Sequence, residues 1–311
     1  MRTALVPPRL EHGDRVRFVS PASPPTRDGV KRGEELLTGW GLRVEIGEHA
    51  FDQVGYLAGA DEDRLADLNE AIRDPGVRAI FATTGGKGAY RIAGDLDFAA
   101  ARRDPKPLVG FSDITHLHLA LWRRCRLVGL SGPFVNWYDE YTGPASAESL
   151  RRALMTTDPI TVHQDPAEPT AAVTVEGSAS GFLMGGNLSE VRGEVGVELP
   201  SLDGAILFIE DVKGTGLGQV DRELTQLMKS GSFDGLRGVA VGQFPGFEET
   251  VRGGWTIIDV LRDRLTRLGV PVLGGLPIGH AHNPHLPTLP LGTNATVDTA
   301  AGTLTVAAGV R

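Results

Sequence analysis

Ser112 stands at a sharp transition from a strand to a helix. Residues 108–111 form a short apolar run typical of a buried strand, and the apolar residues at 114, 117, 120 and 121 have helical spacing. A serine at the apex of such a turn directs its hydroxyl away from the sheet, beside the free N–H groups of the first helical turn. This is the geometry of a nucleophile elbow. The full G-x-S-x-G signature is absent because Ile114 replaces the second glycine, so a Ser112 that only caps the helix is the alternative.

A nucleophilic serine requires a base, and the sequence offers two candidates for it. Three of the eight histidines, His280, His282 and His285, fall within six residues of a Pro- and Gly-rich loop. His116 follows Ser112 on its own helix, although a serine at an elbow projects beyond the helix start. The three clustered histidines could instead bind zinc, but a proline within the loop and the lack of a nearby carboxylate disfavour a preformed cage. A plain polar loop is the third possibility.

Carboxylates and glycines that could complete such a site follow two other strands. The apolar run 205–209 ends in Glu210 and Asp211, and a carboxylate at a strand end can accept an imidazole N–H. A strand-terminal acid in water is the alternative. The segment 83–88 reads Thr-Thr-Gly-Gly-Lys-Gly between a strand and a helix and does not match a P-loop. Backbone N–H groups of Gly85 and Gly86 could face a phosphate or an oxyanion equally well.

Composition excludes several classes of protein. The net charge of −8 disfavours binding to nucleic acid and to anionic membranes, and no run of 18 apolar residues is present. The one cysteine, Cys125, rules out an intrachain disulfide framework and a Cys-rich metal site. The N-terminus lacks the apolar segment of a signal peptide, so a cytoplasmic protein is expected.

Alternating strands and helices predict an α/β fold for the first half of the chain. Strands are expected at 14–20, 42–46, 77–83, 108–111 and 127–131, with helices at 28–41 (capped by Asp28), 61–73, around 90–92 and after Ser112. The connections are too long for hairpins, so we expect a parallel sheet with helices on both faces, of the flavodoxin/Rossmann type. We assign residues 1–157 to this N-terminal domain.

The pattern changes after residue 132, where an aromatic-rich loop precedes one helix near 147–155. Residues 158–170 contain three prolines and are expected to form a linker to a mixed α/β domain at 171–311. Strands are expected there at 205–209 and 238–243, and helices at 221–229 and 255–268. A hairpin is expected to pair residues 295–298 with 303–306.

The chain resembles the LD-carboxypeptidase family of serine peptidases, which also includes the microcin C immunity peptidases. Matching motifs occur in order along nearly the whole chain, at residues 13–16, 20–23, 64–69, 85–86, 110–115 (G-F-S-D-I-T), 185–188 (G-G-N-L), 210, 221–227, 242–244, 276–280 and 288–292. The resemblance implies a triad of Ser112, Glu210 and His280. It also implies an oxyanion hole made by the backbone N–H groups of Gly85, Gly86 and Asp113.

The resemblance further implies a peptidase that needs no metal or organic cofactor and that forms a homodimer. The carboxypeptidase branch usually has Arg before the double glycine and Tyr after it, whereas this chain has Thr84 and Lys87. Lys87 or Arg91 is therefore our candidate for binding a terminal carboxylate, with the contacts of Thr84 left open.

We expect hydrolysis of an L,D amide bond that releases terminal D-alanine from muropeptide tetrapeptides during cell-wall recycling. The alternative within the family is an immunity peptidase that acts on a microcin-C-like peptide–nucleotide or a related peptide antibiotic. The loop after Glu210 lacks an aromatic residue to stack on a nucleobase, which favours the carboxypeptidase. Rival classes are an esterase of another fold, a nucleotide-binding module built on the glycine loop, and a peptide-binding protein without activity.

Overall fold

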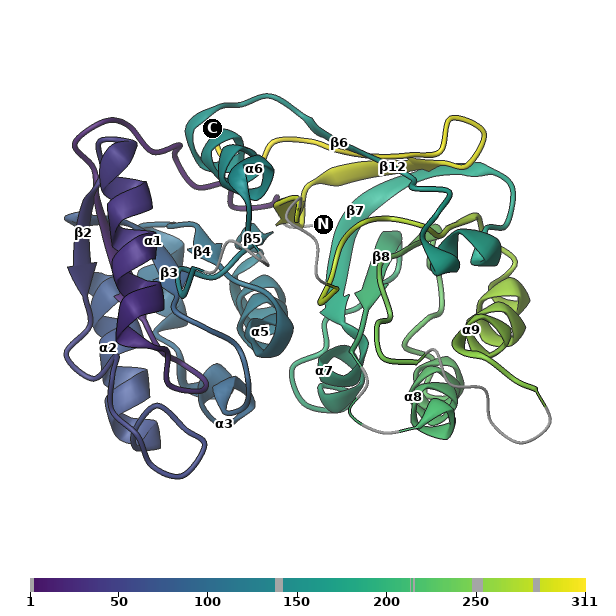
Figure 1. Ribbon diagram of the computed structural model, residues 1–311, viewed down its shortest axis with the longest axis horizontal. Helices are drawn as coiled ribbons and strands as arrows, with labels where there is room; N and C mark the ends of the chain where they lie inside the picture. The colour runs from purple at the N-terminus through teal and green to yellow at the C-terminus, as the bar shows by residue number, and fades with distance from the viewer. Residues whose placement is uncertain (1–2, 138–141, 213, 215, 248–253, 282–285) are drawn as a thin grey trace.

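The chain folds around two sheets that lie side by side, each with helices packed against it (Figure 1). The computed structural model describes residues 3–137, 142–212, 214, 216–247, 254–281 and 286–311. No helix in these ranges is long and apolar enough to cross a membrane. The mixed α/β architecture expected from the sequence is confirmed.

The first sheet has six strands in the order β11-β5-β4-β3-β1-β2. Strands β1 to β5 pair in parallel, and β11, from the last part of the chain, pairs antiparallel with β5. The bounds are β1 Arg15–Val19, β2 Arg43–Ile46, β3 Val77–Ala82, β4 Leu108–Val109, β5 Gly129–Ser131 and β11 Leu289–Leu291. The parallel sheet predicted for the first half is thus confirmed, whereas the contribution of β11 was not predicted.

The predicted helices of the first half all occur in the predicted order, and a further one at Phe98–Arg103 was not predicted. They are α1 Arg27–Gly39, α2 Asp61–Arg73, α3 Ala89–Ile92, α4 Phe98–Arg103, α5 Thr115–Cys125 and α6 Pro144–Met155. The cap predicted at Asp28 is wrong, because the side chain of Thr26 accepts the N–H of Gly29 and Asp28 lies inside the first turn. Helix α2 has the predicted bounds, since Pro75 cannot continue it.

Helix α5 differs from an ordinary amphipathic surface helix. Every residue from Thr115 to Trp122 is buried, because α5 packs on β5 of the first sheet and also on β7 and α7 of the second half (Figure 1). The apolar sequence of the helix suits a position between the two sheets. This packing brings the N-terminal end of α5, where Ser112 lies, to the junction of the two halves.

The second sheet has seven strands in the order β10-β9-β8-β7-β12-β13-β6. Strands β7 to β10 pair in parallel, and β12, β13 and β6 are antiparallel. The predicted hairpin is confirmed, with Ala295 opposite Val306. The elements are β7 Ser178–Asn187, β8 Ala205–Glu210, β9 Gly238–Val241, β10 Val272–Leu273, β12 Asn294–Asp298, β13 Thr303–Val306, α7 Leu188–Gly193, α8 Leu217–Lys229 and α9 Ile257–Leu265.

The segment 158–170, expected to be a linker, contains a strand. Residues Ile160–His163 form β6, which pairs with β13 at the edge of the second sheet. Its prolines lie outside the four paired residues, so they interrupt no ladder hydrogen bond. Residues 160–163 of this segment are therefore part of the second sheet.

Candidate active site

Ser112 lies between the end of β4 and the start of α5, at the carboxyl edge of the parallel strands. Its backbone has a φ of +55°, a left-handed conformation that costs a non-glycine residue about 1–3 kcal/mol. The capping alternative is wrong, because the N-cap of α5 is Ile114 and no side chain caps that helix. The strained turn therefore presents the hydroxyl of Ser112 to other partners.

Ser112, His280 and Glu210 form a row of hydrogen bonds across the two halves of the chain. His280 Nδ1 lies 2.6 Å from Glu210 Oε2, and His280 Nε2 lies 2.9 Å from Ser112 Oγ. An ionised Glu210 can only accept, so Nδ1 carries the hydrogen. In the neutral imidazole, Nε2 then accepts the hydroxyl hydrogen of Ser112. The arrangement can draw a proton from Ser112.

Two local features hold this row in place. Gly279 has a φ of +139°, and a Cβ at this position would lie 2.9 Å from Glu210 Oε2, so glycine allows the close approach of His280 and Glu210. The ring of Phe111 lies 4.9 Å from the His280 ring and stacks on Phe134 at 4.6 Å. Phe111 thus packs beside the imidazole, and Phe134 in turn supports Phe111.

The surroundings of His280 favour its protonated form more than water favours that of a free histidine. Burial of His280 opposes its charge, but the negative charge of Glu210 and the hydrogen bond to it outweigh burial and raise the pKa of His280 above its ordinary value of 6.5. Glu210 itself is only 2% exposed. Because a buried carboxylate is unfavourable unless paired, the ion pair with His280 becomes strongest when the imidazole takes up a proton.

The glycine loop lies directly against Ser112. A Cβ on Gly85 would be 3.0 Å from Ser112 Cβ and 3.1 Å from its Oγ. Ser23 fixes the loop, because its N–H donates to Gly85 O and its hydroxyl accepts the N–H of Lys87. In the described part of the chain no group accepts the N–H of Gly85 or of Gly86. These two donors are available to a bound oxygen near Ser112.

Asp113 supports the same loop with its side chain. Its Oδ2 accepts the N–H of Ala89, at the start of α3, and its side chain is fully buried. Burial raises the pKa of Asp113 to about 6. The carboxyl group thus connects the turn at Ser112 with the end of the glycine loop, while its backbone N–H follows Ser112 directly.

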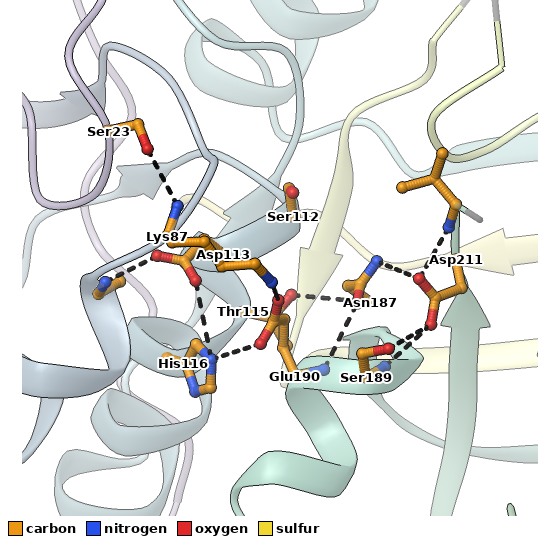
Figure 2. A network of polar contacts seen from close by, with 12 residues as sticks. Ser23, Lys87, Ser112, Asp113, Thr115, His116, Asn187, Ser189, Glu190 and Asp211 are labelled. Atoms are coloured by element: carbon orange, nitrogen blue, oxygen red, sulfur yellow. Dashed lines mark hydrogen bonds and ion pairs between the residues drawn. The ribbon is translucent and has the colours of Figure 1, made fainter. Parts of the chain in front are cut away.

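His116, the second candidate base, lies elsewhere. Its Nε2 is 2.7 Å from Glu190 Oε2 (Figure 2). Its Nδ1 contacts Glu194. Burial disfavours its charge, but the hydrogen bonds to the two glutamates prevail and raise the pKa of His116 to about 9. A histidine held as a cation cannot accept a proton from Ser112.

The other predicted site residues are divided among different places. Lys87 lines a cavity of about 960 Å³ together with Ser112 and His280, and its Nζ lies 3.1 Å from Glu190 Oε1. Thr84 lines a smaller cavity of about 230 Å³ on the His280 side. Arg91 donates to both carboxylate oxygens of Asp61 and lines neither cavity.

Asn187 is a site residue that our sequence analysis did not single out. Its Nδ2 donates to Asp211 Oδ1 at 3.1 Å and, more weakly, to Glu210 Oε1 at 3.4 Å. The preceding glycine, Gly186, allows close approach to α5, since a Cβ there would lie 2.5 Å from Thr115 Oγ1. Asn187 belongs to the G-G-N-L motif of the family, which is the sequence signal by which it could have been found.

Two groups of described residues have the spacing of metal ligands: His49, Asp52 and Asp63, and Asp113, His116 and Glu190. In the second group His116 Nε2 lies 2.7 Å from Glu190 Oε2 and 3.9 Å from Asp113 Oδ1, so its contacts with the two carboxylates already account for the closeness of the side chains. The predicted alternative of a zinc site at His280, His282 and His285 involves residues 282–285, which lie outside the described residues.

Individual proteins similar to this chain include murein peptidases and an immunity protein. The "Probable murein peptide carboxypeptidase" of Bacillus subtilis is 35% identical over 309 residues, covering 98% of this chain and 95% of that protein. The "Microcin C7 self-immunity protein MccF" of Escherichia coli is 26% identical, covering 93% and 92%. Among solved structures, a MccF-like protein from Bacillus anthracis has a TM-score of 0.84 at 25% identity, covering 98% of this chain and all of that one. The muramoyltetrapeptide carboxypeptidase from Oxalobacter formigenes has a TM-score of 0.81 at 26% identity, covering 94% and 98%.

Family models agree with these likenesses over both sheets. The model of the LD-carboxypeptidase N-terminal domain matches residues 16–132, and that of the C-terminal domain matches residues 180–297. The first range includes Ser112, and the second includes Glu210 and His280. This chain belongs to the LD-carboxypeptidase family.

Proposed function

We propose that this protein is a serine-type LD-carboxypeptidase that releases terminal D-alanine from muropeptide tetrapeptides. The observation that carries the proposal is the hydrogen-bonded row of Ser112, His280 and Glu210. Relatives named as murein peptide and murein tetrapeptide carboxypeptidases support the substrate class.

In the proposed reaction Ser112 is the nucleophile. Its Oγ attacks the scissile carbonyl carbon while His280 Nε2 takes up the hydroxyl proton, and Glu210 stabilises the resulting imidazolium. The tetrahedral intermediate collapses when His280 returns the proton to the leaving amine, which departs with the terminal residue. Water then attacks the acyl-enzyme by the same route and restores Ser112.

We assign the oxyanion hole to the backbone N–H groups of Gly85, Gly86 and Asp113. The closeness of Gly85 to Ser112 and the free donors of the glycine loop support this assignment. Donors that are already in position need no reorganisation when negative charge develops on the carbonyl oxygen.

We assign recognition of the terminal carboxylate to Lys87. Burial weakens its charge, but the nearby Glu190 outweighs this effect and raises the pKa of Lys87, so it stays cationic. Arg91, the other candidate, is engaged by Asp61 outside the cavity. Thr84 lines only the smaller cavity, so we give it no contact with the carboxylate.

The test offers matched L,D and L,L tetrapeptides and measures release of the last residue by mass spectrometry. Release from the L,D peptide alone is the expected result. Faster release from the L,L peptide, or release from neither, would contradict the carboxypeptidase and favour the immunity-peptidase alternative, for which a peptide–nucleotide is the next substrate. The homodimer and the cytoplasmic location stay predictions, and sedimentation velocity tests the former.

A further inference from the structure

Two glutamates, one on α7 and one directly after it, join the glycine loop to α5 at one wall of the cavity that contains Ser112. Glu190 lies 3.1 Å from Lys87 Nζ through its Oε1 and 2.7 Å from His116 Nε2 through its Oε2 (Figure 2). Glu194 contacts Nδ1 of the same histidine. All four side chains line the cavity. The two cations come from the first half of the chain and the two glutamates from the second, so these contacts cross the junction of the halves.

The position of His116 between the two glutamates makes it a cation. Each of its ring nitrogens faces a carboxylate oxygen, and an ionised carboxylate can only accept a hydrogen bond, so both nitrogens must carry a hydrogen. The side chain of His116 is 4% exposed, so water and salt screen its charge little. Glu194 is fixed from its other side, because its Oε2 accepts the N–H of Glu198. His116 therefore places a full positive charge beside Glu190.

Lys87 is held less firmly than His116. Its side chain is 60% exposed, compared with 12% for that of Glu190, and an ion pair in such contact with water contributes little free energy. The backbone of Lys87 is fixed separately, because its N–H donates to Ser23 Oγ. The ammonium group can therefore turn from Glu190 to another anion in the cavity while the glycine loop stays in place.

The charges at this wall balance only while His116 is a cation. Among the described residues, Lys87 and His116 are the cations in contact with the two glutamates. With both present, Glu190 keeps a cationic partner when Lys87 turns to a ligand. Without the charge of His116, the two glutamates would share Lys87. Its departure would then leave a largely buried carboxylate unpaired, which is unfavourable.

We propose that His116 sets the affinity of the site for a terminal carboxylate, by keeping Glu190 paired while Lys87 turns to the substrate. His116 is thereby a positioning residue, because it acts through Lys87. The inference rests on the proposed function and explains how a lysine that is already in an ion pair can receive a carboxylate. It assigns opposite effects to two neighbouring side chains, since His116 favours binding of the carboxylate and Glu190 opposes it.

The test compares the L,D tetrapeptide with the same peptide carrying a C-terminal amide. Binding of both is measured by calorimetry on Ser112→Ala, which needs no turnover, and each further variant is made on this background. We expect the acid to bind about three- to tenfold more tightly than the amide. His116→Gln, which removes the charge and keeps a donor, should reduce this ratio to about twofold or less. Glu190→Gln, which removes the competing charge, should raise the ratio by about two- to fivefold. Damage to the site would not strengthen binding of the acid, so Glu190→Gln decides the question even if His116→Gln does not fold.

Adding His116→Gln to Lys87→Met should not change the ratio further, because the effect passes through Lys87. His163→Gln, which changes an exposed histidine on β6 that does not line the cavity, is the matched control and should leave the ratio unchanged. An unchanged ratio in folded His116→Gln, or a lower one in Glu190→Gln, would overturn the inference. The expected ratios in a protein that releases no D-alanine would keep the inference and refute the proposed function. Equal binding of acid and amide, together with release of D-alanine, would do the reverse.

Discussion

Replacing Glu210 by glutamine tests the role of the carboxylate without changing its shape. Glu210 Oε2 accepts Nδ1–H of His280, and Oε1 receives a weak bond from Asn187 Nδ2. An amide has one acceptor for these two donors. If its NH2 group faces His280, Nδ1 must accept, the hydrogen moves to Nε2, and the imidazole can no longer take the proton of Ser112. If its oxygen faces His280, the NH2 group meets that of Asn187 instead.

We therefore expect Glu210→Gln to reduce kcat by about 10³- to 10⁴-fold, the range found when an amide replaces the orienting carboxylate of a serine hydrolase. This corresponds to about 4–5.5 kcal/mol of transition-state stabilisation. The remaining activity should also depend differently on pH. Because the charge of Glu210 raises the pKa of His280, the acid limb of kcat/KM should lie above pH 6.5 in the unmodified protein and move to lower pH in the variant.

The assay measures D-alanine release from the L,D tetrapeptide between about pH 5 and 9, the range in which a histidine titrates. The control is Glu176→Gln, which changes an exposed carboxylate that does not line the cavity of Ser112 and should reproduce the unmodified profile. Thermal melting establishes that Glu210→Gln is folded. Activity within tenfold of the unmodified protein, or an acid limb that does not move, would refute the assigned role of Glu210.

Three further predictions follow from the site. Ser112→Ala and His280→Ala should each lower kcat by about 10³-fold or more. Their effects should not add in the double variant, because the two residues act as one unit. Labelling of Ser112→Ala by an active-serine probe would contradict this prediction. Lys87→Met should raise KM for the tetrapeptide by about three- to tenfold and leave KM unchanged for the same peptide carrying a C-terminal amide. Equal increases in KM for the two peptides would exclude carboxylate binding by Lys87. In the folded protein the pKa of His116 is raised from 6.5 to about 9, so its contribution to the free energy of unfolding is complete below pH 6.5 and is lost as the pH rises through about 9. This contribution is at most about 3 kcal/mol. Urea unfolding at several pH values should detect this pH dependence in the unmodified protein and not in His116→Gln.

Sequence patterns predicted the elements that have strong local signals. Helical spacing and the proline at residue 75 predicted α2 with the correct bounds, and alternation predicted the hairpin of β12 and β13 with the correct register, because each signal depends on neighbouring residues. Ser112, Glu210 and His280 were each recognisable at the end of an apolar segment. Their meeting depends on the packing of two sheets, so only the family resemblance brought them together before the structure did.

Elements that depend on distant partners were missed. Strand β7 begins with Ser, Ala and Gly, which have weak strand propensity, and is stabilised by β8 and β12 on either side. Strand β11 is centred on a proline and forms by pairing with β5, about 160 residues earlier in the chain. The first cap went to Thr26 and not Asp28, because Asn136 also bonds to Thr26 from 110 residues away.

The position of β11 has a consequence for how the protein is made. During synthesis, residues 3–137 emerge long before residues 289–291, which complete the edge of the first sheet. Until then β5 is an open edge, a place where another nascent chain could pair. His280 also emerges late, only a few residues before β11. If Ser112 and His280 act as proposed, the nascent chain stays inactive until residue 280 has left the ribosome, and β11, which completes the edge of the first sheet, follows soon after.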